Sequence, residues 1–219
     1  MAHREGGAAI SEPRTEAKSL REIAPGVYGW HVLDERIGAR SDAYAVAGGA
    51  SVVLIDPLPL APKALESLSR LGRVVAICLT GSCHQRSGWR YRGLFGARLL
   101  APRASQRLEA EPDGFYDVGD RLPGGLRAIH TPGPTESHFA LHGPAAGGVL
   151  FCADVLVHLE RSGLRFVPDV HQDEPARTRV SAKGLLELDF KVLCPAHGAP
   201  VTADAKRAVR GALKKDAAR

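Results

Sequence analysis

The order in which two hydrophobic patterns follow one another is the feature that most restricts the fold of this chain. Residues 27–56 contain three short runs rich in Val, Tyr and Ile, which read VYGWHVL, AYAVAG and SVVLID. Residues of turn type, among them Ser41 and Asp42, separate these runs, so the segment predicts an antiparallel meander. A helical pattern then begins at Pro62, with leucines at three-residue steps.

The remainder of the chain alternates between the two patterns and predicts a layered fold. Helices are expected over 62–71, 87–96, 102–111, 173–189 and 203–215. Strands are expected over 73–80, 97–102, 137–143, 147–154 and 191–196, with two or three more within 115–134. Strands, then alternating helices and strands, then strands again predict an α/β fold in which two sheets face each other with helices outside, a four-layer αββα sandwich.

Length and charge limit the organisation and the partners. The 219 residues suit one domain, and we expect a loose N-terminal arm over 1–22 and a single domain over 23–219 that ends in a basic C-terminal helix. The 29 basic residues are spread along the chain among 24 acidic ones, which argues against a nucleic-acid partner. No run approaches the roughly 18 apolar residues that a membrane span needs.

The cysteines indicate a compartment. Cys78, Cys83, Cys152 and Cys194 lie singly, without the close spacing of a zinc knuckle or a redox pair. The N-terminal segment carries scattered charges and no apolar core of a signal peptide. Reduced thiols and the absence of such a signal predict a cytoplasmic location.

The loop that reads LTGSCHQRSG, residues 79–88, is the first candidate for chemistry. It follows an apolar run and contains one Cys-His pair, Cys83 and His84. Such a pair either contributes to a metal site or is a packed thiol beside a surface imidazole. No G-x-S-x-G elbow, dinucleotide-binding loop or phosphate-binding loop occurs elsewhere, so neither a serine hydrolase nor a nucleotide cofactor is indicated.

Four segments occur in an order that resembles the metallo-β-lactamase superfamily. They read SVVLIDP (51–57), LTGSCHQRSG (79–88), TPGPTESH (131–138) with LFCADVLV (150–157), and VLCPAHGAPV (192–201). The resemblance covers roughly residues 25–205. It implies the αββα fold and, in members with complete motifs, two zinc ions held between the sheets by imidazoles and carboxylates, with an open position for the attacking water.

Carried over by position, the resemblance leaves two of seven expected ligands in place, Asp154 and His197. Gly81 and Cys83 stand where the first two histidines are expected, and Gln85 and Arg86 stand where an aspartate and a third histidine are expected. Pro134 replaces the histidine of the next motif. The resemblance therefore implies that the dinuclear zinc site is largely lost.

Arg86 and Asp56 are the residues that the resemblance places around the site. A guanidinium at the third histidine position repels a metal cation, and we hypothesise that Arg86 instead forms a salt bridge with Asp154. Asp56 resembles the buried aspartate beneath the site, which orients neighbouring groups.

A rebuilt metal site is the alternative. Its candidate ligands are His197, Asp154, His84, His138 and Cys83. His84 occupies a spacer position, from which its side chain is expected to point elsewhere, and His138 resembles a supporting residue rather than a direct ligand. If the site is catalytic, Asp154 and His84 are the expected catalytic residues.

Two functions remain open from sequence. The favoured one is a member without zinc that binds an unidentified small molecule or protein, with no cofactor. The alternative is a metal-dependent hydrolase of an ester, thioester or lactam-like bond that uses one zinc or another divalent ion at Asp154 and His197. No signature of a substrate is recognisable within 34–42 or 156–172.

Overall fold

A computed structural model describes residues 12–218 of the chain. Its larger sheet has seven strands in the order β1-β2-β3-β4-β5-β6-β7. The strands are β1 (Arg21–Ala24), β2 (Val27–Asp34), β3 (Ala39–Gly48), β4 (Ser51–Ile55), β5 (Arg73–Cys78), β6 (Arg98–Pro102) and β7 (Gly114–Tyr116). The first four pair antiparallel, and β4 to β7 pair in parallel. The meander predicted from the first three apolar runs is thus β2, β3 and β4.

The second sheet has five strands in the order β14-β11-β10-β9-β8. They are β8 (Arg121–Leu122), β9 (Leu126–His130), β10 (Phe139–Gly143), β11 (Val149–Ala153) and β14 (Val192–Pro195). A separate hairpin, β12 (Val157–Leu159) with β13 (Gly163–Arg165), follows β11 and was not expected from the sequence.

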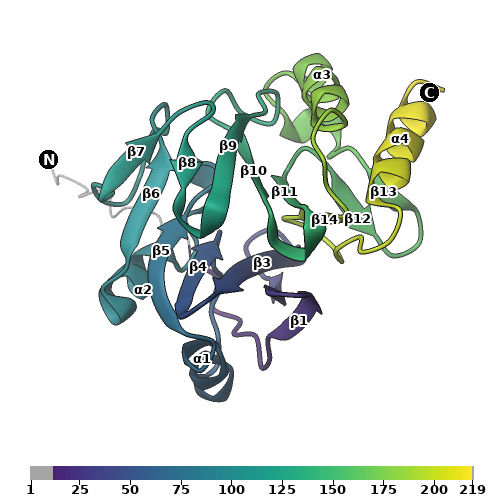
Figure 1. The fold of residues 1–219 in the computed structure, drawn as a ribbon. Coiled ribbons are helices and arrows are strands. Elements are labelled where there is room, and N and C mark those ends of the chain that lie inside the picture. Colours follow the sequence, from purple (N-terminus) through teal and green to yellow (C-terminus); the bar gives the residue numbers. More distant parts are fainter. Residues whose placement is uncertain (1–11, 219) are drawn as a thin grey trace, which may run out of the picture.

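Helices cover the outer face of each sheet (Figure 1). The helices α1 (Pro62–Ser69) and α2 (Gly88–Phe95) lie on the seven-stranded sheet, and α3 (Pro175–Leu185) and α4 (Ala205–Asp216) lie on the other side of the molecule, beside the five-stranded sheet. Short 3-10 turns complete the chain: η1 (Ser82–His84), η2 (Pro123–Gly125), η3 (Ala145–Gly147) and η4 (Asp169–His171). The predicted αββα order is confirmed.

Three apolar cores separate the four layers. One core lies between α1, α2 and the seven-stranded sheet and includes Leu54 and Leu68. The second fills the space between the two sheets, where Ile55 and Phe151 are buried. The third joins the five-stranded sheet to α3 and α4 through residues such as Val209. Residues that alternate along one strand therefore face different cores, as Leu54 and Ile55 do.

One predicted helix is wrong. Residues 103–113, which follow β6, form turns and bends instead of the expected helix over 102–111. The side chain of Gln85 holds this segment: its Nε2 donates to the Arg107 carbonyl at 3.2 Å, and its Oε1 accepts from the Glu109 amide at 2.7 Å. These tertiary hydrogen bonds occupy the backbone groups that a helix would use, and Arg107 adopts a φ of 57°.

The expected arm over 1–22 lies outside the described residues up to position 11. Within the described part, Ala17 is buried and pairs with Leu60, and its amide donates to the Pro59 carbonyl at 2.9 Å. Ala17, within the expected arm, thus packs beside the segment that leads into α1.

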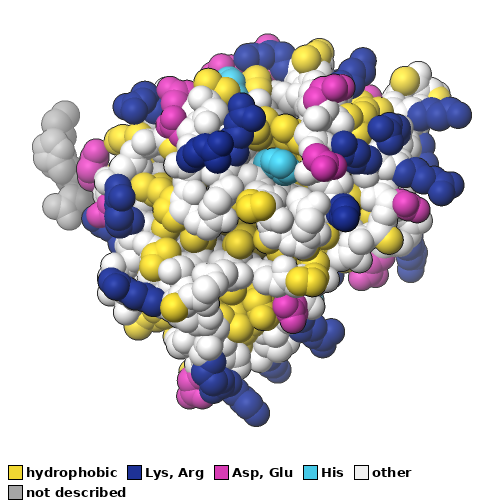
Figure 2. Space-filling view, in the orientation of Figure 1, with side chains coloured by type: hydrophobic (Ala, Val, Ile, Leu, Met, Phe, Trp, Pro, Cys, Tyr) yellow, Lys and Arg dark blue, Asp and Glu magenta, His cyan; other side chains and the backbone are white. Residues whose placement is uncertain are grey.

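Charges of both signs are mixed on the visible surface. On the face drawn in Figure 2, Lys and Arg side chains are scattered, with Asp and Glu side chains among them. No helix in the part of the chain that the structure describes is both long and apolar enough to cross a membrane.

Candidate functional site

Asp154 marks the centre of the candidate site. It follows β11 directly, and its side chain is 19% exposed. Together with His197 it lines a groove of about 680 Å³, whose walls include Ile37, Leu159 and Val167. The groove is large enough for a small organic molecule.

His84 points into this site, contrary to the expectation from its spacer position. It ends η1 and is buried, with Nε2 3.2 Å from Oδ2 of Asp154. Its Nδ1 lies 2.8 Å from the Thr80 hydroxyl and 3.0 Å from Oδ2 of Asp56. The tight 3-10 turn after β5 rotates the side chain inward, which a position count along an extended loop does not predict.

Asp56 and Thr80 fix the orientation of the His84 ring. Asp56 accepts hydrogen bonds from the Thr80 amide (2.8 Å) and the Thr80 hydroxyl (2.5 Å). Because the Thr80 hydroxyl donates to Asp56, it accepts from Nδ1 of His84, and the Nδ1 of His84 carries a proton. The predicted orienting role of Asp56 fits these contacts.

His197 approaches the same carboxylate from the segment after β14. Its Nε2 is 3.3 Å from Oδ1 of Asp154, and its Nδ1 is 2.8 Å from the carbonyl oxygen of Arg40. A carbonyl only accepts, so Nδ1 of His197 also carries a proton. The rings of His84 and His197 lie 6.3 Å apart between centroids, nearly edge to face.

Asp42 and Gly198 position His197, and the sequence did not reveal their role. The sequence pattern places Asp42 in a turn, but it is buried within β3 and accepts from the Gly198 amide at 2.7 Å. Gly198 has a φ of 100°, and a Cβ there would meet the His158 carbonyl at 1.8 Å.

The two imidazoles present their Nε2 atoms to one carboxylate. The Nδ1 protons of His84 and His197 are both donated to other groups. The Nε2 atom of each ring therefore carries either a lone pair or a second proton. Oδ1 of Asp154 is buried and has no hydrogen-bond partner among the described residues. Two lone pairs beside a carboxylate repel it, so this arrangement is stable only with positive charge between the groups, supplied by protons or by a metal ion.

The ionisation of these groups follows from their contacts. Burial opposes the charged form of His84, but the nearby Cys83, Asp154 and Asp56 raise the pKa of His84 well above its usual range. Burial also opposes the charge of Asp154, yet His84 and His197 hold the pKa of that carboxyl well below its usual range. Each group thus stabilises the charge of the other.

Cys83 lies at the edge of the same cluster. It is exposed, and its sulfur, a ligand nitrogen of His84 and a carboxylate oxygen of Asp154 lie within 4.8 Å of one another. The other three cysteines are free and buried.

His138 lies behind the site and supports Asp154. Its Nδ1 is 3.0 Å from the Thr131 carbonyl, and its Nε2 accepts from the Asp154 amide at 3.0 Å. Both nitrogens are therefore engaged, and burial lowers the pKa of His138 to about 4. The prediction of His138 as a possible direct ligand is wrong, whereas its resemblance to a supporting residue agrees with these contacts.

Gln85 and Arg86 do not enter the cluster. Beyond holding residues 103–113, Gln85 accepts from Nε1 of Trp89. Arg86 is buried and donates to the carbonyls of Asp42 (2.8 Å) and Asp56 (3.2 Å). The hypothesised salt bridge with Asp154 is wrong, because the ion-pair partners of that carboxylate are the imidazoles of His84 and His197.

Backbone strain borders the site. Asp56, Arg86 and Ala153 have φ values of 45°, 44° and 45°, in the left-handed region that residues with a Cβ rarely adopt. All three are in the site or next to one of its residues. Such conformations persist where surrounding contacts hold them, and they gather at functional sites.

The sequence of the chain also matches a known family. The profile of the metallo-beta-lactamase superfamily matches residues 17–194. The chain belongs to the metallo-beta-lactamase superfamily. No curated protein matches the sequence.

Solved structures share the superfamily fold over nearly the whole chain. DIM-1 metallo-beta-lactamase has a TM-score of 0.72 at 13% identity, over 92% of this chain and 98% of its own. The metallo-beta-lactamase from Pontibacter korlensis has a TM-score of 0.70 at 16% identity, over 91% and 99%. A metallo-beta-lactamase family protein from Thermus thermophilus has a TM-score of 0.68 at 21% identity, over 90% and 81%.

Metallo-beta-lactamase superfamily members usually bind zinc, and the described part of this chain contains a possible metal-binding group, Cys83, His84 and Asp154. Gly81 and Pro134 offer no side-chain donor, and Arg86 is turned to backbone carbonyls. The ligand atoms of Cys83, His84 and Asp154 lie within 4.8 Å of one another and are of types that suit zinc, and Nε2 of His197 lies 3.3 Å from Oδ1 of the same carboxylate.

Proposed function

We propose that this superfamily member is a metal-dependent hydrolase that holds a single divalent ion, zinc by preference, on His84, Asp154 and His197. The supporting observation is the convergence of two imidazole Nε2 atoms, 3.2 and 3.3 Å away, on the carboxylate of Asp154. Both imidazoles have their Nδ1 protons bound by oxygen acceptors, the usual arrangement around a metal-binding histidine. Cys83 is the candidate fourth ligand.

The neighbouring residues hold these three groups in place. Asp56 and Thr80 orient His84, and the Arg40 carbonyl orients His197. Nε2 of His138 anchors the amide of Asp154. When bound, the ion would polarise a substrate carbonyl and make water a better nucleophile.

The groove beside Asp154 favours a substrate with an apolar part next to its reacting bond. Ile37 and Leu159, which both line the groove, are 56% and 44% exposed. We therefore retain an ester, thioester or lactam-like bond as the class of substrate. A cytoplasmic location, in keeping with four free cysteines, is part of the same proposal.

A second candidate function is supported by the charge state of His84. As an imidazolium it pairs with Asp154 and Asp56 at once, which offsets part of the buried negative charge without a metal. In that case the protein is a member without zinc that binds a small molecule or a protein in the groove.

Metal analysis separates the two candidates. Protein purified without chelator should contain about one equivalent of zinc per chain, and added zinc should raise the melting temperature of chelator-treated protein. Asp154→Ala and His197→Ala should lose the bound metal, whereas His31→Ala, an exposed histidine on β2, should retain it. Less than about a tenth of an equivalent, with no thermal shift, would overturn the metal-dependent proposal and leave the second candidate.

Hydrolysis is tested separately from metal binding. Zinc-loaded protein should hydrolyse p-nitrophenyl esters or thioesters of short acyl chains, and His197→Ala should not. A protein that binds zinc but leaves ester, thioester and lactam substrates unchanged would contradict the catalytic part of the proposal.

A further inference from the structure

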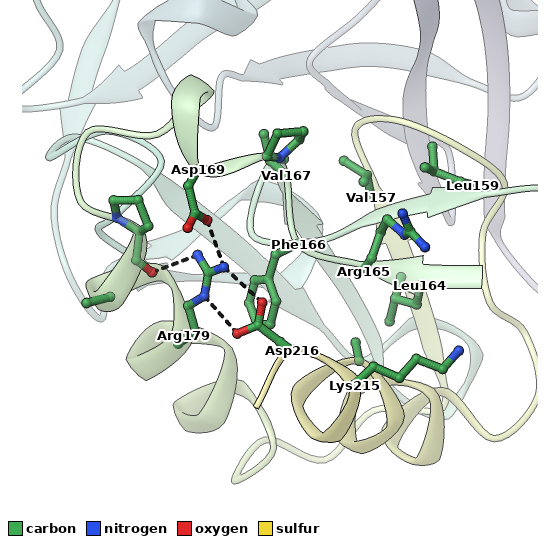
Figure 3. Close-up of a pocket in the computed structure, with 14 residues that line it drawn as sticks. Val157, Leu159, Leu164, Arg165, Phe166, Val167, Asp169, Arg179, Lys215 and Asp216 are labelled. Carbon is green, nitrogen blue, oxygen red and sulfur yellow. Dashed lines mark hydrogen bonds and ion pairs between the residues drawn. The ribbon is translucent and has the colours of Figure 1, made fainter. Parts of the chain in front are cut away.

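A second cavity, of about 970 Å³, adjoins the groove at the β12–β13 hairpin; Figure 3 shows its lining residues. The hairpin, the segment after it, and helices α3 and α4 enclose it. Neither Asp154 nor His197 lines it, although Val157, Leu159 and Val167 line both this cavity and the groove. It is therefore a separate site, and a ligand bound there needs no metal.

The floor of this cavity is apolar. Leu164 of β13, Phe166 and Ala212 of α4 line it, and all three are buried, with exposed fractions of 6%, 7% and 3%. They belong to the third apolar core, so the floor is fixed by packing that extends into the five-stranded sheet. An apolar molecule resting on it would lose contact with water at no cost in rearrangement.

One end of the cavity is closed by a cluster of one cation and two anions. Arg179 of α3 lies over the Phe166 ring, 4.6 Å from its centroid. Its guanidinium pairs with Asp169 at 2.7 Å and Asp216 at 2.9 Å and also donates to the Pro175 carbonyl (Figure 3). The two carboxylates more than offset this cation and leave this end of the cavity with a net negative charge, so it does not attract an anion.

The other cations of the cavity are not balanced in this way. Arg165 lies on β13 opposite Val157, and Lys215 lies on the last turn of α4. Neither forms an ion pair with another residue of the described chain, and Nε of Arg165 is buried without a hydrogen-bond partner there. Two cations and an unused donor beside an apolar floor favour an anion attached to an apolar body.

We propose that this cavity binds a small apolar molecule that carries one anionic group. The anion contacts Arg165 and Lys215, and the apolar body covers Leu164 and Phe166. Arg179 with its two carboxylates limits the length of the ligand. A cationic amphiphile is disfavoured because the same two side chains repel it.

Three probes of equal chain length test the charge requirement: decanoate, decanol and decyltrimethylammonium. Calorimetric titration at low ionic strength should show binding of decanoate, binding of decanol at least about tenfold weaker, and no binding of the cation. Equal affinities for decanoate and decanol, or no binding of decanoate, would overturn the proposal.

Matched substitutions place the anion. Arg165→Gln and Lys215→Gln should each weaken decanoate binding by about tenfold and leave decanol unaffected. The controls are Arg161→Gln, in the turn of the same hairpin, and Lys214→Gln, the neighbour of Lys215 on α4; neither residue lines the cavity. Equal losses in the test and control variants would show nonspecific attraction and overturn the assignment.

The apolar body is placed by filling the cavity. Ala176, an exposed residue of α3, lines the cavity, whereas the exposed Val180 one turn later does not. Ala176→Trp should abolish binding of both decanoate and decanol, and Val180→Trp should preserve it. Asp154→Ala should preserve it as well; loss of decanoate binding in Asp154→Ala would place the ligand in the groove and overturn the proposal.

Discussion

The imidazole of His84 lies with its Nε2 3.2 Å from Oδ2 of Asp154, although the two residues come from different sheets of the sandwich. The 3-10 turn after β5 supplies the imidazole, and the end of β11 supplies the carboxylate. His197 meets the same carboxylate from the segment after β14. The carboxylate of Asp154 thus contacts two imidazoles that come from different segments of the chain.

Asp56→Asn should weaken zinc binding by about 10- to 100-fold without abolishing it. The asparagine can still accept from the Thr80 amide through its oxygen, but it loses the negative charge beside Nδ1 of His84. Zinc affinity is measured by competition with a chromophoric chelator. Asp113→Asn, which removes the charge of a surface carboxylate bound to Arg92, serves as the control and should bind zinc normally. An unchanged affinity in Asp56→Asn would contradict the orienting role of Asp56.

Gly198→Ala should destabilise the protein by several kcal/mol and displace His197. Its Cβ would meet the His158 carbonyl at 1.8 Å, and its φ of 100° is strained for any residue with a side chain. Urea unfolding measures the stability. The control is Gly211→Ala on α4, where the new Cβ meets nothing within 4 Å and the helix should gain up to about 1 kcal/mol. Similar stabilities of the two variants would refute the close packing of Gly198 on the hairpin.

His138 should make the metal-free protein less stable in acid. The folded state holds it neutral with a pKa of about 4, below an unfolded value of about 6.5. Between these values the unfolded chain binds more protons, so stability falls as pH drops from about 6.5 to about 4 and is unaffected above that window. The full loss amounts to about 3 kcal/mol.

Urea unfolding with chelator at neutral and acidic pH checks this. His138→Gln should be less stable at neutral pH but should lose less stability on acidification than the parent protein. His142→Gln, on the β10 strand that begins directly after His138, is the control and should follow the parent profile. If His138→Gln loses as much stability on acidification as the parent protein, His138 is excluded as the source of the acid destabilisation.

Gln85→Leu should release residues 103–113 while leaving zinc binding intact. The amide of Gln85 contacts the backbone of Arg107 and Glu109, the Trp89 ring nitrogen and the Ser82 carbonyl at 3.0 Å, and none of these atoms is a candidate metal ligand. Hydrogen exchange should accelerate in 103–113 and remain unchanged in β11. A loss of zinc in Gln85→Leu would mean that Gln85 takes part in metal binding after all.

The layered fold was predictable because its pattern is local and repeated. Alternation between strand and helix periods places β2 to β6, α1 and α2, and it fixes the pairing of β10 with β11. The prediction of a helix over 102–111 was wrong because the structure of this segment depends on nonlocal contacts. Its propensity was overridden by hydrogen bonds to Gln85, a residue distant in sequence.

The sequence by itself determined the order of layers and showed which donors are absent, since Gly81 and Pro134 have no side-chain donor in any conformation. Only the tertiary structure decided what the remaining groups do. His84 points toward Asp154, Arg86 donates to backbone carbonyls, and His138 accepts a hydrogen bond from the Asp154 amide. Each of these contacts joins residues that are far apart along the chain. The direction of a side chain in a loop follows from those contacts and not from residue spacing. The sequence LTGSCHQRSG therefore shows which residues the loop contains, but the roles of these residues depend on the tertiary structure.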